Sequence, residues 1–271
     1  MLNELKKMCA ALTMFTRLPW YRLCKTDTSH YAHAAAYWPF VGWITGPLLA
    51  LTFWITARFM PTDIAIIVAI SARLLFTGAM HEDGLADYFD GMGGERNREQ
   101  TLRIMKDSHI GTYGVLGLVV YFMLLFNIMQ ELLGVVFINT DGDLKRILFI
   151  TLTTDVWAKC CASLLTGLLP YARNAEEAKT HVVYTPLSRT HILRILFAML
   201  PSLILVFAIT TEWAIPIVLL MLLVPFAVMT GLAMQMRHRL QGYTGDCCGA
   251  TFLLCELSAY FTLLFIARLP F

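Results

Sequence analysis

Residues 81 to 91, His-Glu-Asp-Gly-Leu-Ala-Asp-Tyr-Phe-Asp-Gly, form the most acidic stretch of the chain. If this stretch is helical, Asp83 and Asp87 are spaced i,i+4 and Asp87 and Asp90 are spaced i,i+3, so the three carboxylates share one face. Like charges at these spacings repel each other, and a cation between them removes the repulsion. Clustered oxygen ligands suit Mg²⁺, which usually completes its shell with water and phosphate oxygens. The spacing therefore predicts a Mg²⁺ site.

A simpler interpretation is a solvated acidic loop that caps a helix, with Gly84 and Gly91 as turn residues. Two features of the sequence weigh against it. A long apolar run directly precedes the stretch, and a second dense polar stretch follows it.

The second polar stretch, residues 93 to 114, contains cations, a carboxylate, hydroxyls and glycines. Lys and Arg neutralise oxyanions, and glycine lets backbone N–H groups approach them. This combination predicts binding of a phosphorylated ligand. Contact with lipid headgroups would also explain the cations, but not Asp107, Ser108 and His109.

The third polar stretch, residues 237 to 250, opens the last apolar run. Thr244 or Asp246 could cap the helix that follows. Helix N-termini also attract phosphate, and Asp246 could act as a further metal ligand or base. The capping role and the functional role are compatible.

The composition is that of a membrane protein. Of 271 residues, 58% are hydrophobic and 15% are charged, and the mean hydropathy is +0.63, whereas soluble domains carry roughly 25% charged residues. A net charge of +2 gives no case for nucleic acid as a partner. The seven cysteines include no C-x-x-C pair, which argues against a zinc site and a disulfide framework. We expect no removable signal peptide.

The elements that must position the polar stretches are membrane helices. About 20 apolar residues cross a bilayer, and residues 1–16 have the pattern of an amphipathic helix at the membrane interface. We predict an all-α, polytopic membrane protein that forms one domain over residues 1–271. The expected spans are roughly 35–57, 63–80, 113–133, 147–169, 192–211, 213–232 and 250–269.

Lysine and arginine are distributed unevenly between the connections. Fifteen lie on one side: five in the N-terminal segment, four in residues 81–112, four in residues 170–191 with the start of the next span, and two in residues 233–249. Four lie on the opposite side. The positive-inside rule then predicts a cytoplasmic N-terminus and an external C-terminus. All three polar stretches would face the cytoplasm, where they could converge on one site. Clustered carboxylates with flanking cations suggest metal-assisted phosphoryl chemistry, but no P-loop motif is present.

Asp155, Lys159 and Arg73 are charged residues that fall inside the expected spans. Asp155 and Lys159 are spaced i,i+4 and can neutralise each other, or Asp155 can serve a site. Arg73 either reaches the acidic stretch or a substrate phosphate, or snorkels to the interface. A cation-coupled transporter would instead use all three as an intramembrane relay.

The motifs resemble the cobalamin synthase family, the adenosylcobinamide-GDP ribazoletransferases. The similarity lies in residues 81–87 with Asp90 and Gly91, in residues 105–114, in residues 242–246 with Gly249 and Ala250, and in the opening residues 16–19. The chain departs from the family at Gln241, where a glycine is usual, and at Tyr88 and Phe89, where smaller residues are common.

The resemblance implies a multi-pass enzyme of the bacterial inner membrane whose active site faces the cytoplasm. Such enzymes join adenosylcobinamide-GDP to alpha-ribazole or alpha-ribazole 5'-phosphate, release GMP and require Mg²⁺. A ribose hydroxyl attacks the phosphorus on the cobinamide side of the pyrophosphate. Membrane lipid is the other expected partner, and the sequence leaves the oligomeric state and the choice of ribazole substrate open.

Roles follow from this chemistry as expectations, with Asp83 and Asp87 as the leading catalytic and metal-binding candidates. The general base stays open between Asp246, His81 and His109. The metal candidates are Glu82, Asp83, Asp87, Asp90 and Asp246. The candidate phosphate ligands are Arg96, Arg103, Lys106, Ser108, Arg239 and Thr244. A CDP-alcohol phosphotransferase is the alternative within this chemistry, although its acidic signature arranges the glycines differently.

Overall fold

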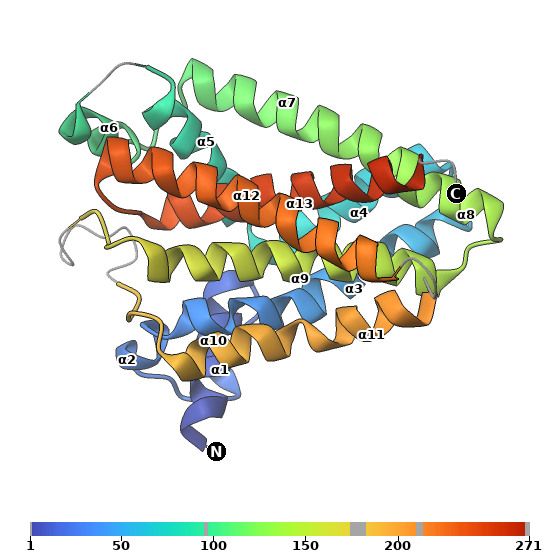
Figure 1. Ribbon diagram of the computed structural model, residues 1–271, viewed down its shortest axis with the longest axis horizontal. Helices are drawn as coiled ribbons and strands as arrows, with labels where there is room; N and C mark the ends of the chain where they lie inside the picture. Colours follow the sequence, from blue (N-terminus) through green and yellow to red (C-terminus); the bar gives the residue numbers. More distant parts are fainter. Residues whose placement is uncertain (1, 95–96, 174–182, 210–213, 269–271) are drawn as a thin grey trace.

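The computed structural model describes residues 2–94, 97–173, 183–209 and 214–268. These residues form a bundle of helices, and no strand occurs among them (Figure 1). The α-helices are α1 (Leu2–Phe15), α2 (Thr28–Tyr31), α3 (Trp38–Ala57), α4 (Thr62–Thr77), α5 (Met80–Met92), α6 (Arg98–Ile104), α7 (Thr112–Met129), α8 (Val135–Asn139), α9 (Leu144–Leu168), α10 (Arg189–Ala198), α11 (Leu200–Ile209), α12 (Ala214–Leu240) and α13 (Gly245–Ala267). The short elements are η1 (Trp20–Arg22) and η2 (Ala34–Tyr37), both 3-10 helices, and the π-helical η3 (Gln130–Gly134).

Six of the helical segments are long and apolar enough to cross a membrane, or seven if the bent pair α4–α5 is one span. This confirms the predicted all-α, polytopic class. Of the expected span 192–211, residues 192–209 lie in α10, the short link at Met199 and α11, and residues 214–232 of the expected span 213–232 belong to a helix that continues to Leu240. Residues 210–213 lie outside the described residues. The last helix begins at Gly245, five residues before the predicted start.

The acidic stretch is helical and follows a sharp break. Helix α4 ends at Thr77, so it is shorter than the predicted span 63–80, and α5 leaves it at 89°. Gly78 and Ala79 make the turn with positive φ angles of 74° and 55°, a region that favours glycine. Gly84 and Gly91 lie within α5, so the interpretation of this stretch as a loop is wrong.

Helix α9 lies at the centre of the bundle. The apolar window of α9 is 89% buried, a larger share than in any other candidate span among the described residues. Gly42 and Gly46 of α3 face it, and a Cβ atom at either position would lie 2.8 Å from Val156 or Leu152. Small residues at such contacts let membrane helices pack closely.

Two ion pairs lie inside the bundle. Lys159 contacts Asp155 and donates a hydrogen bond to Thr45 Oγ1 (3.0 Å), which confirms the predicted pairing within α9. Arg73 is 3% exposed, and its guanidinium lies 2.5 Å from the carboxylate of Glu256 in α13. Arg73 therefore does not snorkel, and its partner Glu256 was not identified from the sequence.

The three polar stretches meet at one end of the bundle. Figure 1 shows α5, α6 and the α12–α13 connection together at this end, opposite the C-terminus. Arginine side chains tie the stretches together. Arg98 donates to the Leu240 carbonyl (2.8 Å), Arg239 to Gly94 (2.5 Å) and Arg173 to Leu102 (3.0 Å). The sequence expectation that they converge is thus confirmed in space.

Candidate active site

The site forms where α5 packs against the start of α13. A Cβ atom at Gly84 would lie 3.1 Å from the Cα and carbonyl oxygen of Asp246, and one at Gly249 would lie 3.2 Å from the His81 carbonyl oxygen. Glycine at both positions therefore lets the two helices approach this closely without a shift of the backbone. This contact brings Asp83, which follows Glu82 on α5, to the same cavity as Asp246 of α13.

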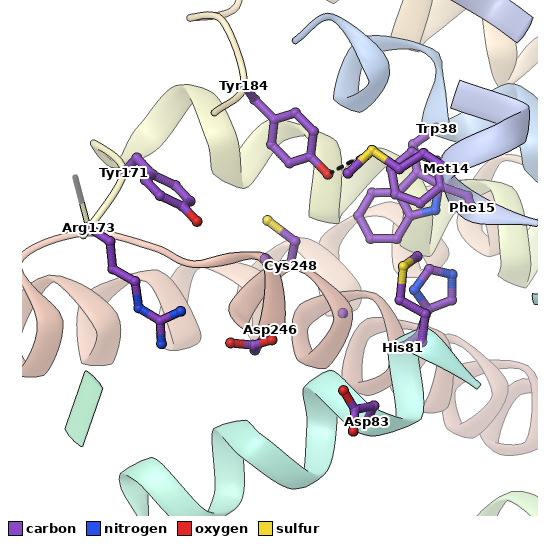
Figure 2. Close-up of a pocket in the computed structure, with 13 residues that line it drawn as sticks. Met14, Phe15, Trp38, His81, Asp83, Tyr171, Arg173, Tyr184, Asp246 and Cys248 are labelled. Carbon is purple, nitrogen blue, oxygen red and sulfur yellow. Dashed lines mark hydrogen bonds between the residues drawn. The ribbon is translucent and has the colours of Figure 1, made fainter. Parts of the chain in front are cut away.

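One cavity, of about 230 Å³, has four aromatic side chains in its walls, and we call it the aromatic cavity. Phe15, Trp38, Tyr171 and Tyr184 contribute the rings; His81, Asp83, Arg173 and Asp246 are among the other lining residues. Figure 2 shows the rings of Phe15, Trp38 and His81 gathered on one side, with Asp83 and Asp246 on another. Burial raises the pKa of Tyr171, so its hydroxyl stays neutral at physiological pH.

A second cavity, of about 250 Å³, is lined mainly by polar residues, and we call it the polar cavity. Its charged and hydroxyl-bearing residues are Asp83, Asp87, Lys106, Asp107 and Ser108. Hydrogen bonds from the backbone and side chain of His109 lower the pKa of Asp107, so this carboxylate is ionised. Asp83 lines both cavities, which makes it the residue that joins them.

Asp90, a predicted metal ligand, binds the start of α7. Its two carboxylate oxygens accept hydrogen bonds from Gly111 N (2.7 Å) and Gly114 N (2.9 Å). These are backbone groups of the glycine-rich stretch from which phosphate binding was predicted. Asp90 thus fixes α5 to α7, and the role of Asp90 as a metal ligand stays a prediction.

His81 and Glu82 are both buried, at 3% and 5% exposure. The His81 ring packs against Trp38 and Phe252 with centroid distances of 5.2 and 5.0 Å. Among the described residues, neither His81 Nε2 nor Glu82 Oε2 has a hydrogen-bond partner. Buried polar groups are usually hydrogen-bonded, so both atoms mark places where the described part of the chain leaves polar groups unsatisfied.

The remaining predicted residues are spread around the two cavities. His109 is exposed, pairs with Asp107 at 2.7 Å, and lines neither cavity. Arg103 is exposed. Thr244 is the N-cap of α13, where its hydroxyl accepts from Cys247 N (3.3 Å). Arg96 lies outside the described residues. Of the candidate phosphate ligands, Lys106 and Ser108 are therefore the two that line a described cavity.

Gln241, where the family usually has glycine, has a φ of 55°. This left-handed conformation favours glycine because it has no Cβ atom. Gln241 lies directly before the loop that leads to Asp246. Because its φ angle is positive, the chain keeps here the backbone conformation that favours glycine, although the side chain differs from that usual in the family.

The acidic residues offer a donor set that fits Mg²⁺. Among the described residues, no three His, Cys, Asp or Glu side chains are close enough to hold a metal by themselves. Mg²⁺, however, is usually held by one or two carboxylates together with water and substrate phosphates. Asp83 and Asp87 lie one helical turn apart and line the same polar cavity, which is the arrangement that such binding requires.

The sequence did not single out the aromatic walls. Trp38 begins α3, Phe15 ends α1, and Tyr171 and Tyr184 lie in the segment between α9 and α10. Arg173 lies in the same segment, and the sequence analysis used it only as one of the cations that indicate the membrane orientation. A concentration of aromatic residues at the polar ends of the spans was the available signal, but such residues also form ordinary membrane-interface belts.

Comparisons with known proteins identify the family of the chain. A family model described as Cobalamin-5-phosphate synthase matches residues 7–264. The adenosylcobinamide-GDP ribazoletransferase of Shewanella oneidensis is 32% identical over 264 residues, which cover 97% of this chain and 95% of the relative. The protein with the same name from Shewanella sp. strain W3-18-1 is 30% identical over 267 residues, 98% of this chain and 97% of the relative. No solved structure matches the chain.

The family match and the relatives extend over nearly the whole chain, so they include all three polar stretches as well as the spans. The chain belongs to the cobalamin-5-phosphate synthase family and is a transferase of the adenosylcobinamide-GDP ribazoletransferase type.

Proposed function

We propose that this chain joins adenosylcobinamide-GDP to alpha-ribazole or alpha-ribazole 5'-phosphate, releases GMP and depends on Mg²⁺. The observation that carries the proposal is the position of Asp83, which lines both the aromatic and the polar cavity. A transferase must bring two substrates together at one reacting centre. Two adjoining cavities with a common carboxylate supply such a centre, and the names of the relatives indicate the substrates.

The polar cavity suits the pyrophosphate of adenosylcobinamide-GDP. Lys106 supplies a positive charge and Ser108 a hydroxyl donor, and both stabilise phosphate oxygens. Asp83 and Asp87 would hold Mg²⁺ beside them. When bound, the metal neutralises charge that develops on the transferred phosphoryl group.

Asp246 is positioned to take the proton of the attacking hydroxyl. It lines the aromatic cavity together with Asp83, whereas His109 lines neither cavity and His81 is buried among rings. In the proposed step the ribose oxygen bonds to the phosphorus on the cobinamide side, and its proton passes to Asp246. The bond between that phosphorus and the bridging oxygen breaks, so that GMP leaves with the oxygen.

We place the reaction on the cytoplasmic side of the bacterial inner membrane. Both cavities are lined by residues of α5, which lies with α6 and the α12–α13 connection at one end of the bundle (Figure 1). The N-terminal segment and the connections expected on that side hold fifteen of the chain's lysines and arginines. A protease-cleavable tag on the N-terminus tests this orientation. Cleavage in inverted vesicles, but not in intact cells, is expected.

The proposed reaction is tested with detergent-purified protein, adenosylcobinamide-GDP, alpha-ribazole 5'-phosphate and Mg²⁺. We expect GMP and a corrinoid product in equal amounts, loss of both with EDTA, and recovery when Mg²⁺ is restored. Folded protein that releases no GMP under these conditions would refute the proposal. Activity with a CDP-activated alcohol would then support the alternative phosphotransferase.

A further inference from the structure

The aromatic cavity is built to receive a flat ring. Phe15 and Trp38 stack with centroids 4.6 Å apart and an interplanar angle of 7°, and Trp38 also contacts the His81 ring at 5.2 Å. Tyr184 and Tyr171 stand across the cavity from these rings in Figure 2. Aromatic faces on more than one side favour a planar aromatic ligand that can stack between them.

Two side chains that line this cavity carry a buried nitrogen without a hydrogen-bond partner among the described residues. These atoms are Trp38 Nε1 and His81 Nε2, on residues 1% and 3% exposed. The indole N–H is only a donor, while the imidazole nitrogen donates or accepts according to its tautomer. Both nitrogens are inaccessible in this structure, so the walls of the cavity hold polar groups that the described residues leave unsatisfied.

The volume of the aromatic cavity limits which part of either substrate can occupy it. Its volume of about 230 Å³ lies below the roughly 300–1,000 Å³ of pockets for drug-sized ligands. A bicyclic base fits this space, but a corrin ring does not. Guanine is also bicyclic, yet it carries several donors and acceptors, and the walls beside the rings include the apolar side chains of Met14 and Met80.

We propose that the aromatic cavity binds the base of alpha-ribazole, with the ribose directed toward Asp83 and Asp246. The assignment rests on the proposed function and adds to it which substrate occupies which cavity. The base of alpha-ribazole presents flat apolar faces, which match the stacked rings in the wall of the cavity. The attacking hydroxyl then lies next to the carboxylates that separate the two cavities.

Binding of alpha-ribazole alone tests the assignment, because it needs neither adenosylcobinamide-GDP nor turnover. Trp38 is one of six tryptophans, and we expect alpha-ribazole to quench protein fluorescence in a saturable manner. Trp38→Phe should remove most of this quenching. Trp54→Phe is the matched control, because Trp54 bonds to the Gly142 carbonyl at the other end of α3; this variant should keep the quenching.

Affinity and kinetics provide the second measurement. Tyr184→Leu removes a half-buried ring from the cavity wall, and we expect the Kd for alpha-ribazole and its KM in the full reaction to rise about tenfold. The KM for adenosylcobinamide-GDP should stay within about twofold. Tyr184→Phe retains the ring and should recover most of the affinity that Tyr184→Leu loses.

Two results would overturn the assignment while leaving the proposed reaction intact. One is quenching by GMP that depends on Trp38 and is absent with alpha-ribazole, which would make this the guanine site. The other is a tenfold rise in KM for adenosylcobinamide-GDP alone in Tyr184→Leu. If alpha-ribazole binds as expected but the unmodified protein releases no GMP, the proposed reaction fails and the base site stands.

Discussion

Asp155 and Glu256, in the middle of the bundle, each contact a cation directly, whereas Asp83 and Asp246, at its polar end, line a cavity. Asp155 and Glu256 are almost fully buried, at 2% and 0% exposure. A buried carboxylate requires a partner because desolvation is costly. At the polar end, substrate and water can reach the carboxylates, so the same residue type is available for chemistry.

Phe252 of α13 connects these two regions. The centroids of the Phe252 and His81 rings are 5.0 Å apart, and His81 lines the aromatic cavity. Lys159 Nζ, which belongs to the buried ion pair with Asp155, lies 4.2 Å from the centroid of the Phe252 ring. The Asp155–Lys159 pair is therefore connected to the wall of the aromatic cavity through the Phe252 ring. We expect the buried ion pairs to contribute to stability and the carboxylates that line the cavities to contribute to turnover. Substitutions in each group test this difference.

The largest effect on stability is expected from Lys159→Met. It leaves Asp155 buried without its cation, which should lower the free energy of unfolding by about 3–5 kcal/mol. The double variant Asp155→Asn/Lys159→Met removes both charges and should recover much of the loss. Chemical unfolding in detergent measures both. Lys145→Met, an exposed change on the same helix, is the control and should have little effect.

This pair also distinguishes an enzyme from a transporter that uses Asp155 and Lys159 as a relay. If the double variant folds and releases GMP at near the normal rate, the pair is structural. Loss of GMP release in a folded double variant would show that the buried Asp155–Lys159 pair is needed for the reaction, and the division between stability and turnover would be wrong.

The largest effect on turnover is expected from Asp83→Asn. This exposed side chain lines both cavities, and its loss should reduce GMP release more than about 100-fold, or about 3 kcal/mol. Stability should change by less than about 0.5 kcal/mol. Asp63→Asn, an exposed change at the start of α4, should alter neither quantity. Near-normal turnover of Asp83→Asn at saturating Mg²⁺ would contradict the proposed site.

Local patterns made much of the fold predictable. Apolar runs located the spans, i,i+4 spacing located the Asp155–Lys159 pair, and the acidic stretch proved helical. Each of these features depends on residues close together in the sequence, where helical periodicity determines which side chains are neighbours.

Contacts between distant residues were not predictable in this way. Arg73 and Glu256 are 183 residues apart, and no periodic pattern links them. The carboxylate of Asp90 accepts from backbone N–H groups that looked suited to phosphate, since spacing alone does not show which anion reaches a glycine-rich turn. The aromatic cavity draws Phe15, Trp38 and Tyr184 from separate elements, so it exists only in the folded chain.

A moderate effect on both stability and turnover is expected from Gly84→Ala, because it acts at the contact that brings the carboxylates together. The new methyl group would lie 3.1 Å from the Asp246 backbone, and overpacking of this kind costs about 1–3 kcal/mol. GMP release should fall several-fold as α5 and α13 move apart. Gly231→Ala, which has nothing within 4 Å of its Cβ position, should be neutral or slightly stabilising. Equal behaviour of the two variants would show that close helix contact is not required.

The smallest effect is expected from Lys106→Gln, which removes a charge from the polar cavity. Because Lys106 is exposed, water screens its interaction with phosphate, and we expect the KM for adenosylcobinamide-GDP to rise about tenfold, or about 1.4 kcal/mol. The KM for alpha-ribazole should not change, since Lys106 does not line the aromatic cavity. Lys106→Arg should retain most of the affinity, and exposed Lys25→Gln is the control. A rise in the KM for alpha-ribazole instead would mean that the polar cavity holds the ribazole substrate, and the assignment of the two cavities would have to be exchanged.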